Sequence, residues 1–341
     1  MKIILDAMGG DLAPEAPVLG AVEAAKAYGT EITLVGRGEE ILEVLRKHGI
    51  ENLPQGIEIA HADDVVDMHD DPGSVIHKRK NSSMIVGLKM LADGQGDAFI
   101  SAGSTGALVV GATTIVKRIK GIKRAALAPV IPADKGCFML IDSGANMDCK
   151  PEYLHQFGIM GSVYMENVMG YKNPTVGLVN VGTEDCKGGE LQHEAFALLK
   201  ADTSLNFMGN IEARTIPSGE TTVVVADGFT GNVVLKMYEG VSSTLLKKIK
   251  GVFMQRFTNK LAALVLKKDM NALKKTIDYN EYGGAPMVGV TKPVFKAHGS
   301  SKAKTFYNAL KLTYKYVEAK VTDQIAEAIA QSTAAETADE A

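Results

Sequence analysis

The 341-residue sequence contains no tryptophan and only three cysteines. Cys137, Cys149 and Cys186 lack the spacing of a metal site and are typical of reduced thiols that pack rather than react. The seven histidines are scattered without a paired ligand pattern, which argues against structural zinc. No apolar run is long enough to cross a membrane, and the chain enters an expected strand at once, so no signal peptide is visible. These absences favour a cytoplasmic protein without a bound metal.

Acidic residues are scarce in the C-terminal third, although the net charge of the chain is only −3. Residues 234–320 contain 17 Lys or Arg against 5 Asp or Glu, a local charge of +12, so the remainder carries −15. Such a basic surface suits an acidic protein or an anionic membrane. Nucleic acid is the weakest candidate, because no nucleic-acid-binding motif accompanies the charge.

The N-terminal sequence alternates between short apolar runs and helical patterns. We expect strands at residues 2–6, 31–36 and 57–60, and helices at 17–28 and 39–48. This alternation predicts an α/β fold of three layers, with a doubly wound, mostly parallel sheet. In such sheets ligands gather at the carboxyl ends of the strands, so the loops there are candidate sites.

No linker or internal repeat divides the chain. We therefore expect a single two-lobed α/β unit over residues 1–331. The Ala/Thr/Glu-rich residues 332–341 are expected to form a disordered tail.

The loop Ser101–Gly106 follows an expected buried strand at 96–100 and precedes an apolar helical stretch at 108–119. A strand that turns into a helix leaves the first helical N–H groups without partners, and the helix dipole is positive there. With nearby hydroxyl groups, these donors suit a small anion such as phosphate. Alternatively, Ser104 only caps the helix and the glycines only turn the chain. The candidate phosphate-binding residues are Ser101, Gly103, Ser104, Thr105 and Gly106.

Further loops at strand ends repeat the same chemistry of glycine, Asp, Asn or lysine. One such loop is commonplace, but several in one chain indicate more than turn formation. The candidate substrate-binding residues in these loops are Asp6, Gly9, Gly10, Asp142, Asn146, Asn180, Gly182, Asp227 and Gly228. The candidate catalytic residues are Lys135, Lys187, Asn232 and His298.

A helical pattern at about 236–268 contains no acidic residue from Gly240 onward. It places Phe253, Phe257, Leu261 and Leu264 on one stripe. An ordinary core or dimer helix is one interpretation. The other is a helix that docks on an anionic membrane or an acidic partner through Lys247, Lys248, Arg256, Phe253, Phe257 and Leu261.

The segment Asp70–Met84 is polar and basic. Its cluster Lys78, Arg79 and Lys80 forms either a solvated loop or a substrate contact. Ser82 or Ser83 is expected to cap a helix that follows at 84–93.

Taken together, these loops resemble the phosphate acyltransferase family of bacterial phospholipid synthesis. The resemblance covers roughly residues 1–320, with small departures at Ser143 and Thr230. Its motifs are Asp6-Ala7-Met8-Gly9-Gly10-Asp11, Ser101-Ala102-Gly103-Ser104-Thr105-Gly106-Ala107, Asp142-Ser143-Gly144-Ala145-Asn146, Asn180-Val181-Gly182, Asp227-Gly228-Phe229-Thr230-Gly231-Asn232, Tyr282-Gly283-Gly284-Ala285-Pro286 and Ala297-His298-Gly299-Ser300-Ser301.

The resemblance implies an enzyme that makes acyl phosphate from acyl-(acyl carrier protein) and inorganic phosphate. It implies a fold similar to that of the isopropylmalate and isocitrate dehydrogenases and of phosphotransacetylase. It also implies a cytoplasmic homodimer without metal or nicotinamide, associated with the inner face of the membrane. A glycerol-3-phosphate acyltransferase is the implied downstream partner.

Acyl transfer to phosphate requires a held nucleophile and fixed donors for the oxyanion. We expect the Ser101–Gly106 loop to hold phosphate, with Lys135 or Lys187 adding charge. Asp142 and Asp227 would repel phosphate, and are expected to orient a lysine or to bind backbone amides. His298 is the candidate proton donor or oxyanion partner, unless it only caps a loop.

Three other functions fit parts of the sequence. A phosphotransacetylase that uses acyl-CoA is the nearest alternative. An NAD-linked, metal-dependent dehydrogenase is disfavoured, because no dinucleotide fingerprint is present. A membrane-bound scaffold would tolerate bulky residues at Ser104 and Thr105.

Overall fold

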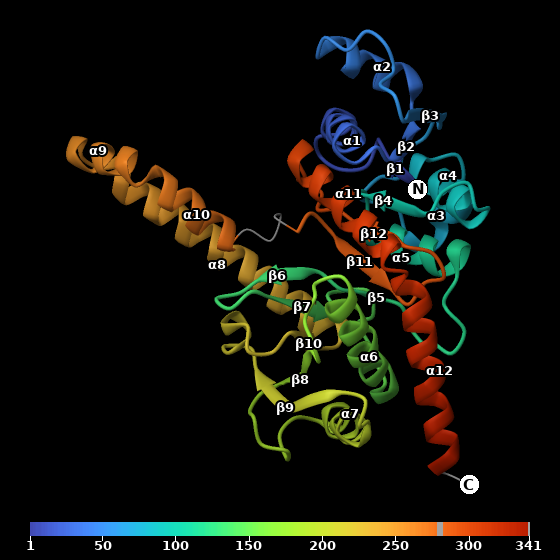
Figure 1. Ribbon diagram of the computed structural model, residues 1–341, viewed down its shortest axis with the longest axis vertical. Helices are drawn as coiled ribbons and strands as arrows, with labels where there is room; N and C mark the ends of the chain where they lie inside the picture. Colours follow the sequence, from blue (N-terminus) through green and yellow to red (C-terminus); the bar gives the residue numbers. More distant parts are fainter. Residues whose placement is uncertain (278–281, 340–341) are drawn as a thin grey trace.

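The computed structural model describes residues 1–277 and 282–339 (Figure 1). Within these residues the first lobe is built on a seven-stranded sheet in the order β3-β2-β1-β4-β12-β11-β5. The run from β3 to β12 is parallel, and β11 is antiparallel to both of its neighbours. The strands are β1 (Lys2–Asp6), β2 (Glu31–Gly36), β3 (Ile57–His61), β4 (Ala98–Ser101), β5 (Ala126–Leu127), β11 (Ala285–Val288) and β12 (Val294–Lys296).

The second lobe is built on a five-stranded sheet, among the described residues, in the order β6-β7-β10-β8-β9. All of its pairings are parallel except β6 with β7, which form a hairpin. The predicted mostly parallel α/β fold is therefore confirmed, with two sheets. The strands are β6 (Val130–Pro132), β7 (Cys137–Ile141), β8 (Thr175–Asn180), β9 (Asn206–Glu212) and β10 (Val223–Val225).

Helices cover both faces of the first sheet, because successive strand residues point to opposite sides. Ile3 and Leu5 of β1 join a core cluster with the helices α1 and α11, while Ile4 joins a second cluster with α4 and α5. The first cluster continues into the second lobe through β7 and α6. The helices of the two lobes are α1 (Glu15–Tyr28), α2 (Gly38–Lys47), α3 (Pro72–Lys78), α4 (Ser83–Ala92), α5 (Thr105–Gly111), α6 (Pro151–Asn167), α7 (Glu190–Ala201) and α11 (Ala303–Glu318).

The helix predicted at 108–119 has different bounds in the structure. It begins at Thr105 as α5 and changes at Ala112 into a π-helical turn (Ala112–Val116). In that turn the hydroxyl groups of Thr113 and Thr114 donate to the carbonyl of Val110, which competes with regular α-helical pairing. A 3₁₀ turn (Ile216–Ser218) precedes β10.

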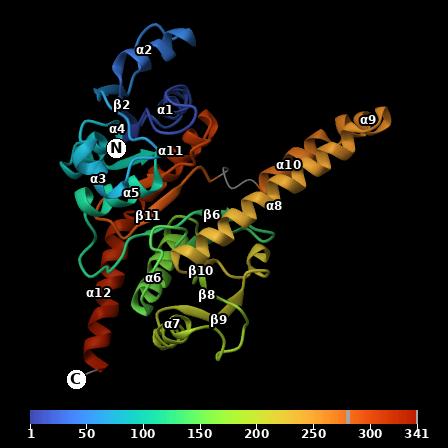
Figure 2. The ribbon, with the colours of Figure 1, turned by 180° about the vertical axis from the view of Figure 1, so that it is seen from behind.

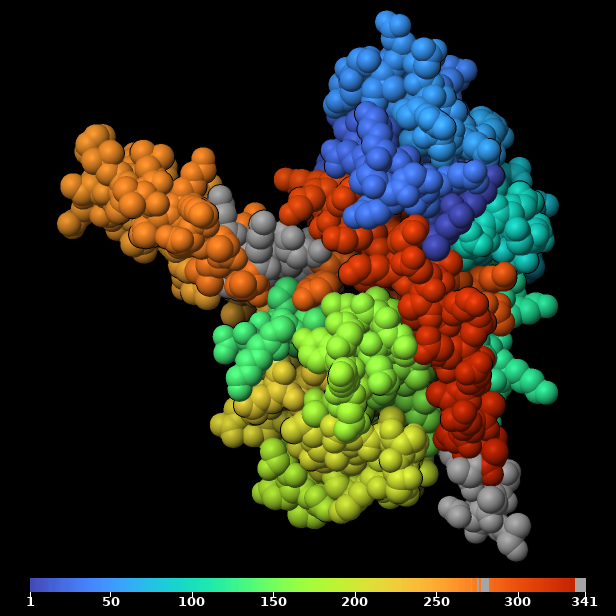
Figure 3. Space-filling view, in the orientation of Figure 1, coloured from blue at the N-terminus to red at the C-terminus, as the bar shows by residue number. Residues whose placement is uncertain are grey.

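The single helix predicted at 236–268 is wrong in its bounds and its continuity. The helix α8 (Gly228–Met254) starts earlier and ends before Arg256, whose backbone is extended. Two shorter helices, α9 (Phe257–Val265) and α10 (Lys267–Ile277), then fold back beside α8, so that the three project from the body as a hairpin (Figures 2 and 3). Phe253 and Phe257 therefore lie on different helices rather than on one stripe.

Side-chain chemistry explains this break. The side-chain amide of Asn259 donates to the carbonyl of Val252 at 2.9 Å, and at the end of α8 this carbonyl otherwise accepts only a long 3.4 Å bond from the backbone amide of Gln255. Phe253 and Met254 of α8 line a groove together with Ala263 of α9 and Met270 of α10. Folding back thus buries apolar surface that a continuous helix would expose.

The predicted disordered tail is also wrong as far as the structure describes it. The helix α12 (Val321–Asp339) runs through most of residues 332–341, and residues 340–341 lie outside the described part. The sequence there lacks proline and glycine and is rich in alanine, which favours helix continuation.

Candidate active site

A cavity of about 240 Å³ lies where the two lobes meet. The first lobe contributes α5, the approach to β11 and the end of β12. The second lobe contributes β6, the loop after β7 and the first turns of α8. Its lining includes Thr105, Gly106, Leu127, Pro129, Val130, Asn232, Leu235, Lys236, Glu239, Lys296 and His298.

Asp6 organises the floor beneath the predicted phosphate loop. It is 1% exposed and accepts hydrogen bonds from the hydroxyl of Ser101 at 2.6 Å and from the amide of Met8 at 3.1 Å. Burial raises the pKa of Asp6, while hydrogen bonds from Ser101 and Ser83 oppose that rise. Ser101 in turn accepts from the amide of Gly103 at 3.0 Å. Asp6 and Ser101 therefore hold the loop in shape from below rather than line the cavity.

The predicted phosphate loop divides into two parts. Ser104 is the N-cap of α5 and accepts from the amide of Ala107 at 3.5 Å, which matches the capping alternative for this residue. Thr105 and Gly106 line the cavity at the first turn of α5, where the amides have no intrahelical partners. Free amides at the start of a helix are donors that suit an anion.

The predicted substrate loop at Gly9 and Gly10 packs between two other loops. A Cβ atom on Gly9 would lie 2.6 Å from Oδ2 of Asp6 and 2.7 Å from the amide nitrogen of Gly103. Gly10 has φ of +103°, and the neighbouring Asp11 amide donates to the carbonyl of Gly299 at 2.8 Å. This close approach requires glycine and joins the phosphate loop to the His298 loop.

Lys296 is the most buried cation of the site. It ends β12, lies next to the phosphate loop, and its ammonium donates to the carbonyl oxygens of Ala102, at 3.3 Å, and Ala297. Burial lowers the pKa of Lys296 to about 8, against a smaller opposing effect of Asp6. Sequence reasoning missed Lys296; the only signal was a lysine at the end of an otherwise apolar strand beside His298.

His298 lines the same cavity two residues beyond the end of β12. Its Nδ1 accepts from the amide of Ser300 at 3.2 Å and lies 2.8 Å from that residue's hydroxyl. With Nδ1 as acceptor, the neutral ring carries its proton on Nε2. Burial lowers the pKa of His298, Glu239 raises it, and Lys236 and Lys296 lower it further. The ring is therefore a neutral hydrogen-bond donor at pH 7.

The first turns of α8 form the opposite wall. Asn232, Leu235, Lys236 and Glu239 follow the spacing of one helix face and all line the cavity. The ammonium of Lys236 pairs with the carboxylate of Glu239 at 2.9 Å. Glu239 is thereby partly neutralised, and the cavity keeps a net positive character.

The predicted carboxylates Asp142 and Asp227 bind backbone amides, which is one of the two roles expected for them. Asp142 accepts from the amides of Leu127, Gly144, Ala145 and Asn146 at 2.6 to 3.3 Å. The side chain of Asn146 donates to Asp142 within the loop and to the carbonyl of Ala125, which precedes β5. These hydrogen bonds fix the loop after β7, whose residues Ser143 and Gly144 line the cavity.

Asp227 caps α8, since it accepts from the amide of Thr230 at 2.8 Å. A Cβ atom on Gly228 would lie 2.3 Å from the carbonyl oxygen of Asn146, so this position permits close packing of α8 on the loop after β7. The two residues set where α8 begins.

The structure does not bring Lys135 and Lys187 to the cavity. Lys135 sits in the β6–β7 hairpin, at the amino end of β7, and pairs with Glu220 at 3.6 Å. Lys187 follows β8, which β10 separates from β7, and lies 3.9 Å from Glu184. Asn180 and Gly182 belong to the same β8 loop, where the Asn180 side chain donates to the carbonyl of Lys187. Lys296 and Lys236 occupy the place expected for a loop lysine.

The predicted docking residues lie on the α8–α10 hairpin. Lys247, Lys248 and Arg256 are exposed, as are Phe257, 75%, and Leu261, 49%. Phe253 is half-buried in the hairpin groove.

Residues 1–277 and 282–339 contain neither a membrane-spanning helix nor a metal-binding cluster. No helix there combines the length and apolarity needed to cross a bilayer. Within the same residues, no three His, Cys, Asp or Glu side chains gather as a metal-binding group.

Comparison with known sequences gives matches along nearly the whole chain. A family model described as "Fatty acid synthesis protein" matches residues 1–324. The chain is 47% identical over 332 residues to a phosphate acyltransferase from Clostridium novyi (strain NT), covering 97% of this chain and 99% of that one. It is 48% identical over 326 residues to a phosphate acyltransferase from Clostridium botulinum (strain Loch Maree / Type A3), covering 95% and 96% of the two chains.

Comparison with solved structures gives the fold. A phosphotransacetylase from Streptococcus pyogenes superposes with a TM-score of 0.61 at 17% identity, covering 93% of this chain and 94% of that one. The EutD phosphotransacetylase from Staphylococcus aureus gives 0.60 at 15% identity with the same coverage. At such identities the likeness shows the fold alone, and it confirms the predicted similarity to the phosphotransacetylase fold.

Proposed function

The chain belongs to the fatty acid synthesis protein family, and from this membership we propose that it is a phosphate acyltransferase that moves a fatty acyl group to inorganic phosphate. The proposal rests on the 47% and 48% sequence identity to phosphate acyltransferases, which extends over nearly the whole chain. The cavity supports it, because anion-binding amides, a buried lysine and a neutral imidazole surround one space. The product is acyl phosphate, the activated acyl donor for phosphatidic acid and phospholipid synthesis.

The polar side of the cavity is the proposed phosphate site. The amides of Thr105 and Gly106 and the ammonium of Lys296 hold phosphate with one oxygen directed at the thioester carbonyl carbon. That oxygen forms the new C–O bond, and collapse of the tetrahedral intermediate breaks the C–S bond. The departing thiolate then takes up a proton.

His298 is the proposed oxyanion donor. Its neutral ring donates from Nε2 to the carbonyl oxygen as negative charge develops there. The burial that lowers the His298 pKa keeps the ring neutral, so it adds no second buried charge beside Lys296. Asn232, which faces Gly144 across the cavity wall, is a second candidate donor.

The apolar side of the cavity is the proposed site for the first carbons of the acyl chain. Leu127, Pro129, Val130 and Leu235 line it, opposite the charged groups. This division places the reacting carbonyl at the boundary between apolar and polar walls.

The acyl donor separates this function from its nearest alternative. Purified protein is given acyl-(acyl carrier protein) or acyl-CoA of the same chain length, together with phosphate, and acyl phosphate is trapped with hydroxylamine. We expect a kcat/KM for the carrier protein at least tenfold higher. A preference for acyl-CoA would instead favour a phosphotransacetylase.

The pH dependence of the reaction follows from Lys296, whose folded-state pKa is about 8. Only the protonated ammonium attracts phosphate, so kcat/KM for phosphate, which reports the free enzyme, should fall about tenfold per pH unit above pH 8.

The contribution of Lys296 to the free energy of unfolding should change in the opposite direction. The unfolded chain binds more protons than the folded one between pH 8 and Lys296's ordinary pKa of 10.5, so this group makes the free energy of unfolding rise with pH there. An activity loss that coincides with falling thermal stability would contradict this origin.

The α8–α10 hairpin is the proposed docking surface for the acidic acyl carrier protein. Replacing Lys247, Lys248 and Arg256 with Glu should raise KM for the acyl carrier substrate at least tenfold and leave KM for phosphate unchanged. The effect should weaken as salt screens both charges. The matched control replaces three exposed lysines elsewhere, Lys26, Lys172 and Lys311, with Glu. An equal rise in KM for both triple variants would refute a local docking site.

The same hairpin supports two further proposals. At its tip, Phe257, Leu264 and Val265 are 75%, 69% and 81% exposed, lie among lysines and suit the surface of an anionic membrane.

Along α8, apolar side chains exposed at a spacing of four residues suit a homodimer contact: Phe229, Val233, Met237, Val241 and Leu245. In this arrangement acyl phosphate is released at the inner face of the cell membrane, where a glycerol-3-phosphate acyltransferase consumes it. Vesicle flotation and light scattering test the two contacts.

A further inference from the structure

The segment from Asp64 to Met84 packs against the outer side of the phosphate loop. A Cβ atom on Gly106 would lie 2.7 Å from Cγ of Pro72, the first residue of α3. A Cβ atom on Gly103 would lie 2.7 Å from Cε of Met84. The segment therefore contacts the loop at both of its glycines, and any shift of the segment is transmitted to the first turn of α5.

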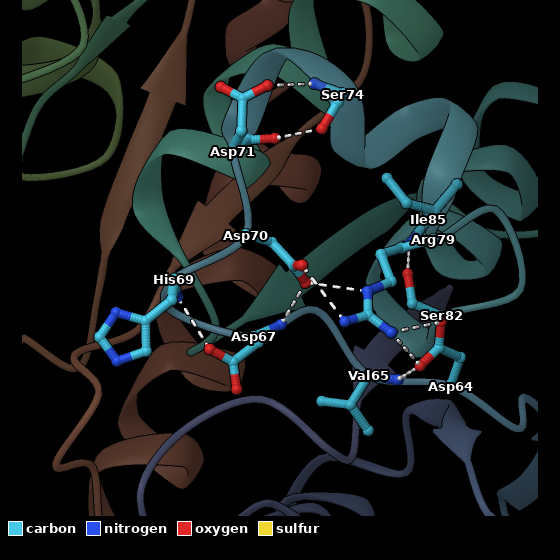
Figure 4. A network of polar contacts seen from close by, with 10 residues as sticks. All are labelled: Asp64, Val65, Asp67, His69, Asp70, Asp71, Ser74, Arg79, Ser82 and Ile85. Carbon is cyan, nitrogen blue, oxygen red and sulfur yellow. Dashed lines mark hydrogen bonds and ion pairs between the residues drawn. The ribbon is translucent and has the colours of Figure 1, made fainter.

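Arg79 ties this segment together through two carboxylates (Figure 4). Its Nε and Nη2 donate to the two oxygens of Asp70, at 2.9 and 3.2 Å, in a bidentate pair. Its Nη1 donates to Asp64, at 3.2 and 3.4 Å. The Arg79 bond lowers the pKa of Asp70. A planar guanidinium suits this double geometry, which a lysine cannot reproduce.

Backbone bonds extend the pairing to the ends of the segment. The amide of Ser83 donates to the carbonyl of Asp64 at 3.0 Å, and the amide of Ser82 donates to the carbonyl of Arg79 at 2.9 Å. Ser83 also hydrogen-bonds Asp6, the floor of the phosphate loop. At the other end, Asp71 caps α3 by accepting from the amide of Ser74 at 3.1 Å. Arg79 thus lies at the centre of a hydrogen-bonded frame on the outer side of the loop.

We propose that Arg79 is a positioning residue, which fixes the phosphate loop through Pro72 and Met84 without contacting the substrate. This inference rests on the proposed function, because it assigns phosphate to that loop. This assignment gives Arg79 a different role from Lys78 and Lys80, the other two residues of the basic cluster. Lys78 and Lys80 are exposed, whereas the Arg79 side chain is 36% exposed and its guanidinium is held by the carboxylates of Asp64 and Asp70.

The experiment compares Arg79→Met, Arg79→Lys and the neighbouring control Lys80→Met in the full chain. For R79M we expect KM for phosphate to rise about tenfold to a hundredfold, because loss of alignment is costly for a positioned nucleophile. KM for the acyl donor should stay within about twofold of wild type. R79K should restore only part of the affinity for phosphate that R79M loses. K80M should have the same KM for phosphate as wild type. Ethylguanidinium added to R79M should lower the phosphate KM.

Thermal unfolding separates positioning from folding. Wild type, R79M and K80M are melted with and without phosphate, and R79M should lose phosphate-dependent stabilisation while its ligand-free midpoint changes little. An active R79M with the wild-type phosphate KM would refute the proposal, as would an equal rise in KM for both substrates. Failure of the proposed function looks different, because wild type itself would then show no turnover.

Discussion

Replacing Lys296 with methionine is expected to lower kcat/KM for phosphate by on the order of 10²- to 10³-fold, the usual cost of removing one preorganised electrostatic group. The ammonium is the most buried cation at the cavity and lies between the phosphate loop and the His298 loop. In this low-dielectric position its charge is poorly screened, so its attraction for a phosphate in the cavity is strong. Steady-state kinetics at pH 7 with phosphate varied measures the effect.

The same substitution should not destabilise the fold. Burial lowers the pKa of Lys296 to about 8, so the ammonium is mostly protonated at pH 7 but its charge costs free energy in the folded state, and methionine of similar length removes that cost. The matched control is Lys135→Met, which removes an exposed lysine whose pair with Glu220 lies at the other end of β7. K135M should keep wild-type kinetics. Wild-type phosphate kinetics in K296M would remove this lysine from the proposed site.

The sequence predicted the sheet because each strand carries its own local signal. Residues 2–6, 31–36 and 57–60 are short apolar runs between helical patterns, and they form β1, β2 and β3 almost as expected. The predicted cavity residues Thr105, Gly106, Asn232 and His298 also meet in space. Their shared signal was a polar loop directly after a strand.

The choice of lysine could not be predicted in the same way. Lys135 and Lys187 lie in polar loops, which made them candidates, but strand order decides which loops meet. In the order β6-β7-β10-β8, the Lys187 loop is two strands away from β7, and the Lys135 hairpin is at the opposite end of β7. Lys296 reaches the cavity because β12 pairs with β4, a contact between residues far apart in the sequence.

The hairpin shows a second limit of local patterns. Most of residues 236–268 are helical, as their periodicity predicted. No proline precedes Arg256 to mark the break between α8 and α9. The break depends on contacts that form only when α9 and α10 return beside α8, among them the Asn259 bond to the Val252 carbonyl. Tertiary packing overrides propensity here.

Replacing Gly231 with alanine is expected to destabilise the protein by about 3 kcal/mol or more, at the upper end of overpacking effects. Gly231 lies in the first turn of α8, and a Cβ atom there would lie 1.9 Å from the carbonyl oxygen of Asp142 and 3.0 Å from its carbon. The obstacle is backbone, so no flexible side chain can move aside. Relief requires α8 to move away from the loop after β7, which would also displace Asn232, Lys236 and Glu239 from the cavity. Denaturant unfolding measures the stability, and phosphate kinetics below the transition measures the displacement.

The control lies on the same helix. At Gly240 of α8 a Cβ atom would meet nothing within 4 Å, so Gly240→Ala replaces a poor helix former with the best one at no steric cost. We expect G240A to stabilise the protein by about 0.5 to 1 kcal/mol. The opposite signs separate close packing at Gly231 from any general effect of alanine in α8. If both variants were equally stable, the contact between the start of α8 and Asp142 would not constrain the cavity wall.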